Sequence, residues 1–163
     1  MDELIKSVYD EWRIANADAV RKCRDARLHI LADKLAECEL LTGTETLPEL
    51  IDIIFSPQGR EFMTRFGFPS VETFRRFIPY HPEQYGVFID AAEIALTDVS
   101  RVFLIGNTSA RLNYRETQGN TVILMHGASA EINAGGYSVL RVERDAVSPR
   151  PVVHSKDHAV VVL

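Results

Sequence analysis

The sequence lacks any apolar run long enough to cross a bilayer, and it has only two cysteines among 163 residues. A transmembrane helix needs roughly 18 or more consecutive apolar residues, so no membrane association is expected. The first four residues lack the basic and apolar regions of a secretory signal. A continuous helix would hold Cys23 and Cys38 about 22 Å apart, too far for a disulfide. These features predict a cytoplasmic protein with reduced thiols.

An excess of positive charge is also lacking. The chain has 18 basic and 23 acidic residues, and the net charge is −5. Residues 1–45, 46–86 and 87–163 carry −3, −1 and −1, so binding to nucleic acid by bulk electrostatics is not expected. The basic residues between 21 and 27 are interrupted by Asp25. They indicate a solvated helix face, and a regulator that binds a host protein or nucleic acid through this face is a weaker alternative.

Motifs of catalysis and cofactor binding are missing as well. The sequence has no Gly-x-Ser-x-Gly elbow, no phosphate-binding loop and no histidine next to either cysteine in sequence. His154 and His158 have the spacing of a metal pair on a helix, but the flanking valines are typical of strands. The sequence therefore predicts no metal and no cofactor, and it favours a non-catalytic protein over an enzyme.

Residues 3–41 contain neither proline nor glycine and are expected to be helical. Two apolar stripes follow three-four spacing on shifted phases: Ile5, Val8, Trp12, Ala15 and Ala19, then Leu28, Leu31, Leu35 and Cys38. Either one helix continues through the shift, or two helices meet near Asn16. A continuous helix would be about 58 Å long and would need a partner helix from another copy. The alternative is an antiparallel helix pair within one chain.

The sequence of residues 46–86 predicts three short helices rich in phenylalanine. Thr46-Leu47-Pro48-Glu49 has the threonine, proline and glutamate of a helix start. Ser56-Pro57 begins a second helix that Gly67 ends, and Ser70 begins a third. The aromatic residues at helical spacing are expected to form a core that joins the helical region to a β region after residue 86 and caps one end of it.

From residue 87 onward the period changes to short apolar segments every seven to twelve residues. Their centres are Val87-Ile89, Ile94-Leu96, Val102-Ile105, Ala110-Leu112, Val122-Leu124, Ala130-Ile132, Val139-Val142, Val152-Val153 and Val160-Val162. Stacked coils of short strands, a β-solenoid, fit this spacing. Strands could recur every twenty residues, or every 23 to 30 if grouped in threes. An antiparallel β-sandwich is the competing fold.

The expected fold class is therefore α+β, with a helical N-terminal half followed by an all-β C-terminal half. Three parts are expected: a long helix or helix pair in residues 1–45, an aromatic-rich region of short helices in 46–86 and a β-rich region in 87–163.

Four strings resemble a family of small uncharacterised proteins of gut bacteria that are often encoded near mobile or phage-derived genes. They are Ser56-Pro-Gln-Gly-Arg-Glu-Phe, Tyr85-Gly-Val-Phe-Ile-Asp, Ile105-Gly-Asn-Thr and Val122-Ile-Leu-Met-His-Gly-Ala. The Gly-Asn-Thr-x-Ala and Gly-Ala-x-Ala strings also resemble repeats of short bacterial β-solenoids. The resemblance covers about residues 47–142. It implies a phage or mobile-element role and assigns no catalytic residue.

Two functions remain open. The favoured one is a non-catalytic structural or protein-interaction module that self-assembles as a trimer or dimer. The alternative is a small-molecule-binding protein or small enzyme with its site between the aromatic helices and the first strand. The candidate ligand-binding residues of that site are Tyr80, His81, Tyr85, Asp90 and His126.

Overall fold

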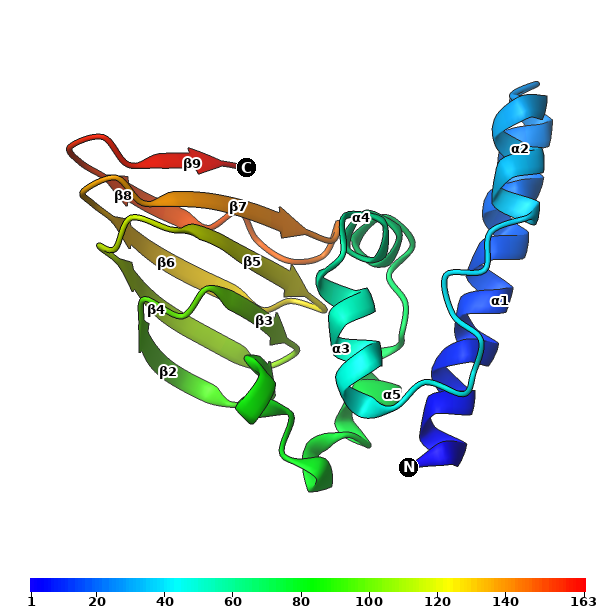
Figure 1. Ribbon diagram of the computed structural model, residues 1–163, viewed down its shortest axis with the longest axis horizontal. Helices are drawn as coiled ribbons and strands as arrows, with labels where there is room; N and C mark the ends of the chain where they lie inside the picture. The colour runs from blue at the N-terminus through cyan, green and yellow to red at the C-terminus, as the bar shows by residue number, and fades with distance from the viewer.

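The computed structural model describes residues 1–163, with helices in the N-terminal half and strands in the C-terminal half (Figure 1). The helices are α1 (Asp2–Asp25), α2 (His29–Ala36), α3 (Leu47–Phe55), α4 (Pro57–Phe66) and α5 (Val71–Arg75), followed by the 3-10 turns η1 (Ile78–Tyr80) and η2 (Pro82–Tyr85). The strands are β1 (Val87–Ile89), β2 (Ala92–Thr97), β3 (Arg101–Ile105), β4 (Thr108–Tyr114), β5 (Gly119–Met125), β6 (Ser129–Ala134), β7 (Val139–Arg144), β8 (Val152–Ser155) and β9 (Val160–Val162).

All nine strands pair in parallel, in two sheets. The odd-numbered strands form the sheet β1-β3-β5-β7-β9, and the even-numbered strands form β2-β4-β6-β8. Val87 pairs with Phe103, Arg101 with Thr121 and Glu131 with Val152, so one coil takes 16 to 21 residues. The β region is therefore a solenoid of about four turns. This confirms the predicted α+β fold class; the sandwich alternative is wrong, and so is the grouping of strands in threes.

The interior of the solenoid lies between the two sheets. Leu112, Ile132 and Leu140 are fully buried there, because inward residues of successive coils stack in register. Strands β3 and β5 are apolar at consecutive positions, since they are covered on both faces. Leu104 faces this interior, whereas its neighbour Phe103 faces the helices.

The short helices lie beside the C-terminal ends of the odd-numbered strands and pack on the outer face of β1, β3 and β5 (Figure 1). Their core contains Phe62, Phe74 and Phe77, as the phenylalanine spacing predicts. The ring of Phe74 meets Phe103 of β3 edge to face, with centroids 5.4 Å apart. The helical region therefore joins the β region as predicted, but it covers the side of the solenoid and not one end of the stack.

Helices α1 and α2 form an antiparallel hairpin that we call the arm. The chain reverses at residues 26–28, where Arg27 has a φ of 60°. Asn16, expected near a helix boundary, lies inside α1, and its side-chain amide donates to the carbonyl of Leu35 at 3.0 Å. A single long helix is therefore excluded, and the helix-pair alternative holds. No helix of the structure has the length and apolarity that crossing a membrane requires.

The predicted helix starts are confirmed. Thr46 and Glu49 form a reciprocal capping box at α3. Ser56 and Ser70 accept backbone hydrogen bonds at the starts of α4 and α5. Gly67 ends α4 with a φ of 66°, a left-handed conformation that favours glycine.

Aspartates stand at both corners of the first coil, as Asp90 and Asp98, and of the last, as Asp145 and Asp157. The helix-side corner follows odd-numbered strands, and the far corner follows even-numbered ones. Corner aspartates accept backbone N–H groups of a neighbouring coil, which would otherwise lack partners. The pairs are Asp90 with Asn107, Asp98 with Arg115, Asp145 with His126, and Asp157 with Gly136, at 2.7, 2.7, 2.7 and 3.2 Å. These carboxylates hold adjacent coils together.

Candidate functional site

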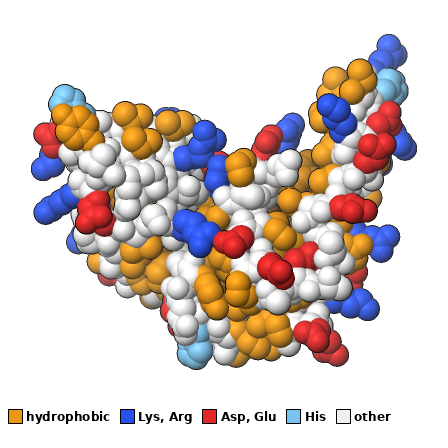
Figure 2. Space-filling model, in the orientation of Figure 1, with side chains coloured by type: hydrophobic (Ala, Val, Ile, Leu, Met, Phe, Trp, Pro, Cys, Tyr) orange, Lys and Arg blue, Asp and Glu red, His pale blue; other side chains and the backbone are white.

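A groove of about 580 Å³ separates the inner side of the arm from α4. Figure 2 shows the corresponding hollow between the arm and the body, with hydrophobic side chains along the arm. Ten of the fifteen lining residues are apolar. They include Leu28 and Leu31 near the tip, Leu35 and Cys38 further down, and Phe66 of α4. The second predicted stripe therefore lines a surface groove.

The tip of the arm is unusually apolar for an exposed surface. Leu28, Ile30 and Leu31 are 52%, 79% and 45% exposed. In α2 only Ala32 is buried. Isolated exposed apolar residues are ordinary, but a contiguous group marks an interaction surface. The first stripe behaves differently, because Ile5, Val8 and Trp12 are buried against the body.

Charge is unevenly distributed between the two helices of the arm. Residues 18–27 carry four basic groups and two acids, a net +2, while residues 29–39 carry three acids and one lysine, a net −2. Asp18 pairs with Arg21 and with Lys22, the latter at 2.7 Å. Both basic partners remain more than 60% exposed, so the α1 end stays positive and the α2 side stays negative.

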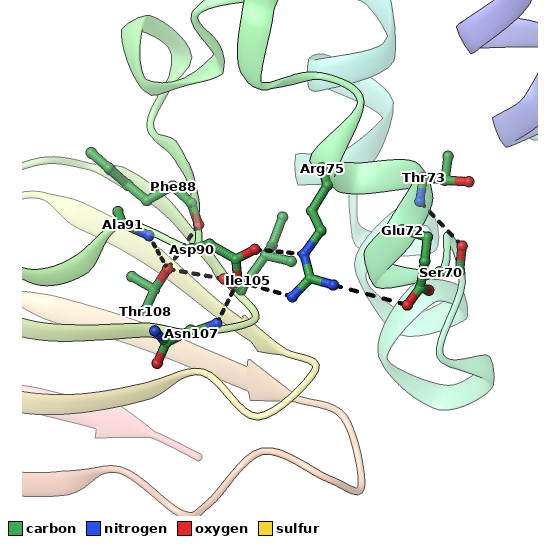
Figure 3. Close-up of polar contacts among 10 residues, drawn as sticks. All are labelled: Ser70, Glu72, Thr73, Arg75, Phe88, Asp90, Ala91, Ile105, Asn107 and Thr108. Carbon is green, nitrogen blue, oxygen red and sulfur yellow. Dashed lines mark hydrogen bonds and ion pairs between the residues drawn. The ribbon is translucent and has the colours of Figure 1, made fainter.

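The junction of helices and β region holds Asp90, one of the five predicted ligand-binding residues (Figure 3). Arg75 of α5 donates to the Asp90 carboxylate at 2.6 Å, and the backbone N–H of Asn107 donates at 2.7 Å. The Arg75 guanidinium and then the Asn107 N–H hold the pKa of Asp90 below its usual value. A Cβ atom at position 106 would overlap the same carboxylate, so this contact requires glycine there. Asp90 thus joins α5 to two coils.

Acid is expected to weaken this junction. A carboxyl group whose pKa is lowered in the folded state stabilises the fold above its unfolded pKa, near 3.8, and this contribution disappears as pH falls through the lower folded value. Asp90→Asn should lower the Tm by about 2–4 °C at pH 7. The difference from the wild type should shrink near pH 3. Thermal melts at both pH values test this, with the exposed Glu93→Gln as control. An equal difference at both values would contradict it.

His126 is also part of the junction packing. Its ring Nε2 lies 2.8 Å from the carbonyl oxygen of Pro69, and its backbone N–H donates to Asp145. The ring meets Phe74 at a centroid distance of 5.8 Å. His126 follows β5 and Asp90 follows β1, so the β3 coil corner at Gly106 lies between them.

The other three predicted ligand-binding residues lie apart from that pair. Tyr80, His81 and Tyr85 occupy the 3-10 segment before β1, and all three are exposed. His81 is 3.0 Å from Glu83. The enclosed cavity beside this junction is lined mainly by apolar residues and has a volume of about 20 Å³, room for no more than a water molecule. Ligand binding by the five residues stays a prediction.

A polar contact between the helical half and the β half could not be predicted from the local sequence. Arg60 of α4 is 9% exposed, donates to Glu143 of β7 at 3.0 Å and donates to the carbonyl of Phe55 at 2.8 Å. The pair joins positions 83 residues apart. An arginine in the middle of an otherwise amphipathic helix offers only a weak indication of such a partner.

The described side chains include no group of three or more His, Cys, Asp or Glu residues placed to hold a metal ion. His154 lies 3.8 Å from Glu131, and the ring of His158 stacks on Tyr137. Comparison of the chain with protein-family models, curated protein sequences and solved structures finds no match. The groove beside the arm is the candidate functional site that the geometry defines best.

Proposed function

We propose that this protein is a non-catalytic interaction module that self-assembles through its arm. The observation that supports this most directly is the exposure of Leu28 and Leu31 beside a groove lined largely by apolar residues. A two-helix hairpin with one apolar stripe is half of a four-helix bundle, and a second hairpin buries that stripe. The solenoid then serves as a rigid body that the arm connects to its partner.

Charge supports a second copy of the same chain as the occupant. In a two-fold arrangement the same patch meets itself, so α1 of one arm can lie against α2 of the other. This pairing sets the positive end of α1, at +2, against the negative α2 segment, at −2, twice per dimer. A dimer is therefore favoured over a trimer in this proposal.

Leu31→Asp should dissociate the assembly and leave the β region folded. A charge placed in the apolar interface loses its hydration, and interface positions of this kind contribute about 2 kcal/mol or more, which is roughly a 30-fold weaker association. Light scattering gives the mass, and far-UV circular dichroism reports folding.

Ile14→Asp is the matched control, because Ile14 is 73% exposed on the same arm and does not line the groove. It should leave the mass unchanged. A Leu31→Asp protein with the mass of the wild type would locate the interface elsewhere.

The compartment and biological setting belong to the same proposal. Both cysteines are free and partly exposed, which fits a reducing compartment such as the cytoplasm. The link to phage or mobile genes rests on the four sequence strings alone and stays a prediction. Ligand binding at the junction, with or without catalysis, stays the alternative prediction.

A further inference from the structure

A second cleft, distant in the chain from the arm, lies at the far corner of the solenoid and has a volume of about 330 Å³. Three coils contribute to it, through the ends of β4, β6 and β8. Its lining comes from in-register positions of these strands and the residue after each: Asn113, Tyr114 and Arg115; Asn133, Ala134 and Gly135; His154, Ser155 and Lys156.

The lining is basic in a protein that is acidic overall. The nine residues include Arg115, Lys156 and His154 but no aspartate or glutamate, whereas the whole chain carries −5. The side chains of Arg115 and Lys156 form no ion pair and donate no hydrogen bond within the chain, while most other arginines pair with a carboxylate. Two cations therefore flank the cleft with their charge uncompensated.

The carboxylates near the cleft already interact with other groups of the chain. Glu131 lies between Arg111 and His154, at 3.7 and 3.8 Å. Asp98 accepts the backbone N–H groups of Arg115 and Glu116, at 2.7 and 3.2 Å. Asp157 accepts the N–H of Gly136 at 3.2 Å. None of these groups is placed to neutralise both cations of the cleft.

Neutral donors add to the two cations. Asn133 donates its amide to the Asn113 oxygen at 3.2 Å, which leaves the Asn113 amide N–H groups free to donate. The next residue, Tyr114, points to the opposite face of β4, into the solenoid interior, where its hydroxyl is buried without a hydrogen-bond partner. It is therefore not counted among the donors of the cleft.

Spacing sets the size of the ligand. Arg115 and Lys156 follow β4 and β8, which are two strand spacings, or about 9.5 Å, apart. The corner between them is Gly135, where an added Cβ would lie only 3.1 Å from the Lys156 Cε atom. The Lys156 side chain therefore passes over Gly135. Two cations at this separation can contact a single compact anion, because both side chains are long and exposed.

We propose that the far-corner cleft binds a tetrahedral oxyanion, the phosphate or sulfate group of a small molecule. Arg115 and Lys156 supply the charge, and the Asn113 amide and the Ser155 hydroxyl donate hydrogen bonds from separate directions. Donors that approach from several sides suit a tetrahedral anion better than a planar carboxylate. This site is independent of the arm and of self-assembly.

The test is a titration of the full chain followed by ¹⁵N-resolved NMR at constant ionic strength. The probes are sodium phosphate, sodium sulfate and sodium acetate, with sodium chloride as the reference. Phosphate or sulfate should cause saturable shifts confined to residues 113–115, 133–136 and 154–157, and acetate should bind more weakly. The preferred probe of the first two distinguishes a phosphate from a sulfate ligand. Shifts that never saturate, that spread over all basic residues or that chloride reproduces would overturn the proposal.

Substitutions distinguish a loss of anion binding from a loss of folding. The double variant Arg115→Gln/Lys156→Gln should weaken anion binding roughly tenfold or more, and Lys6→Gln/Arg13→Gln, a matched pair of exposed cations in the helical half, should not. Tyr114→Phe should leave anion binding unchanged and the Tm unchanged or raised, because it removes an unpaired hydroxyl that lies in the solenoid interior. Unchanged anion affinity in the Arg115→Gln/Lys156→Gln protein would refute the site.

Discussion

Ile132→Asp is expected to unfold the β-solenoid. Ile132 is fully buried between the sheets and stacks in register on Leu112 and Val153 of the adjacent coils. An aspartate there must either remain charged without hydration or bind a proton, because the interior cluster contains no cationic side chain. We expect a loss of about 5 kcal/mol or more, comparable with the whole stability of many domains.

The measurement is a urea or thermal unfolding curve followed by far-UV circular dichroism. Ser109→Asp places the same charge on the exposed face of β4 and should change the free energy of unfolding by about 0.5 kcal/mol or less. Ile132→Val should cost about 1 kcal/mol, since it removes one methyl group. A cooperative transition for Ile132→Asp near that of the wild type would show that the space between the sheets is not a packed interior.

Arg60→Ala is expected to lower the free energy of unfolding by about 3 kcal/mol. The substitution leaves the Glu143 carboxylate, whose side chain is only 20% exposed, without its closest cation. It also removes the donor to the Phe55 carbonyl at 2.8 Å. Breaking one partner of a largely buried pair costs about 3–5 kcal/mol. The lower end applies here, because Arg141 lies 3.7 Å from the same carboxylate and compensates part of the charge.

Arg65→Ala provides the matched control for this contact. Arg65 lies on the same helix and pairs with Glu61 at 3.9 Å, but both side chains are at least 70% exposed. Such surface pairs contribute about 0–1 kcal/mol. Urea denaturation of the two variants should therefore give clearly different midpoints. Equal losses would mean that the Arg60–Glu143 pair does not hold the helices on the solenoid.

The strands could be predicted from sequence because a solenoid repeats one local rule. Each predicted apolar centre, from Val87-Ile89 to Val160-Val162, lies within or overlaps a strand of the structure. Inward residues of successive coils must be apolar, and corner residues such as Asp98 must adopt left-handed conformations, which aspartate and glycine tolerate best. The spacing of such corners gives the length of a coil.

The arm was harder to predict because the reversal at residues 26–28 carries no glycine or proline. Arg27 adopts the left-handed conformation there, against its usual preference. The stripe from Leu28 to Cys38 was visible in the sequence, but its exposure depends on where the chain folds back. The Arg60–Glu143 pair and the far-corner cleft depend on contacts between distant positions, which local patterns do not encode.

The central claim, self-assembly through the arm, is tested most directly by the absolute mass of the wild-type chain in solution. Light scattering at two concentrations a hundredfold apart separates a stable assembly from weak association. The proposal predicts twice the mass of the 18.3 kDa chain at both concentrations. A mass of one chain at the higher concentration would contradict the proposal and leave the stripe of the arm without the partner proposed for it.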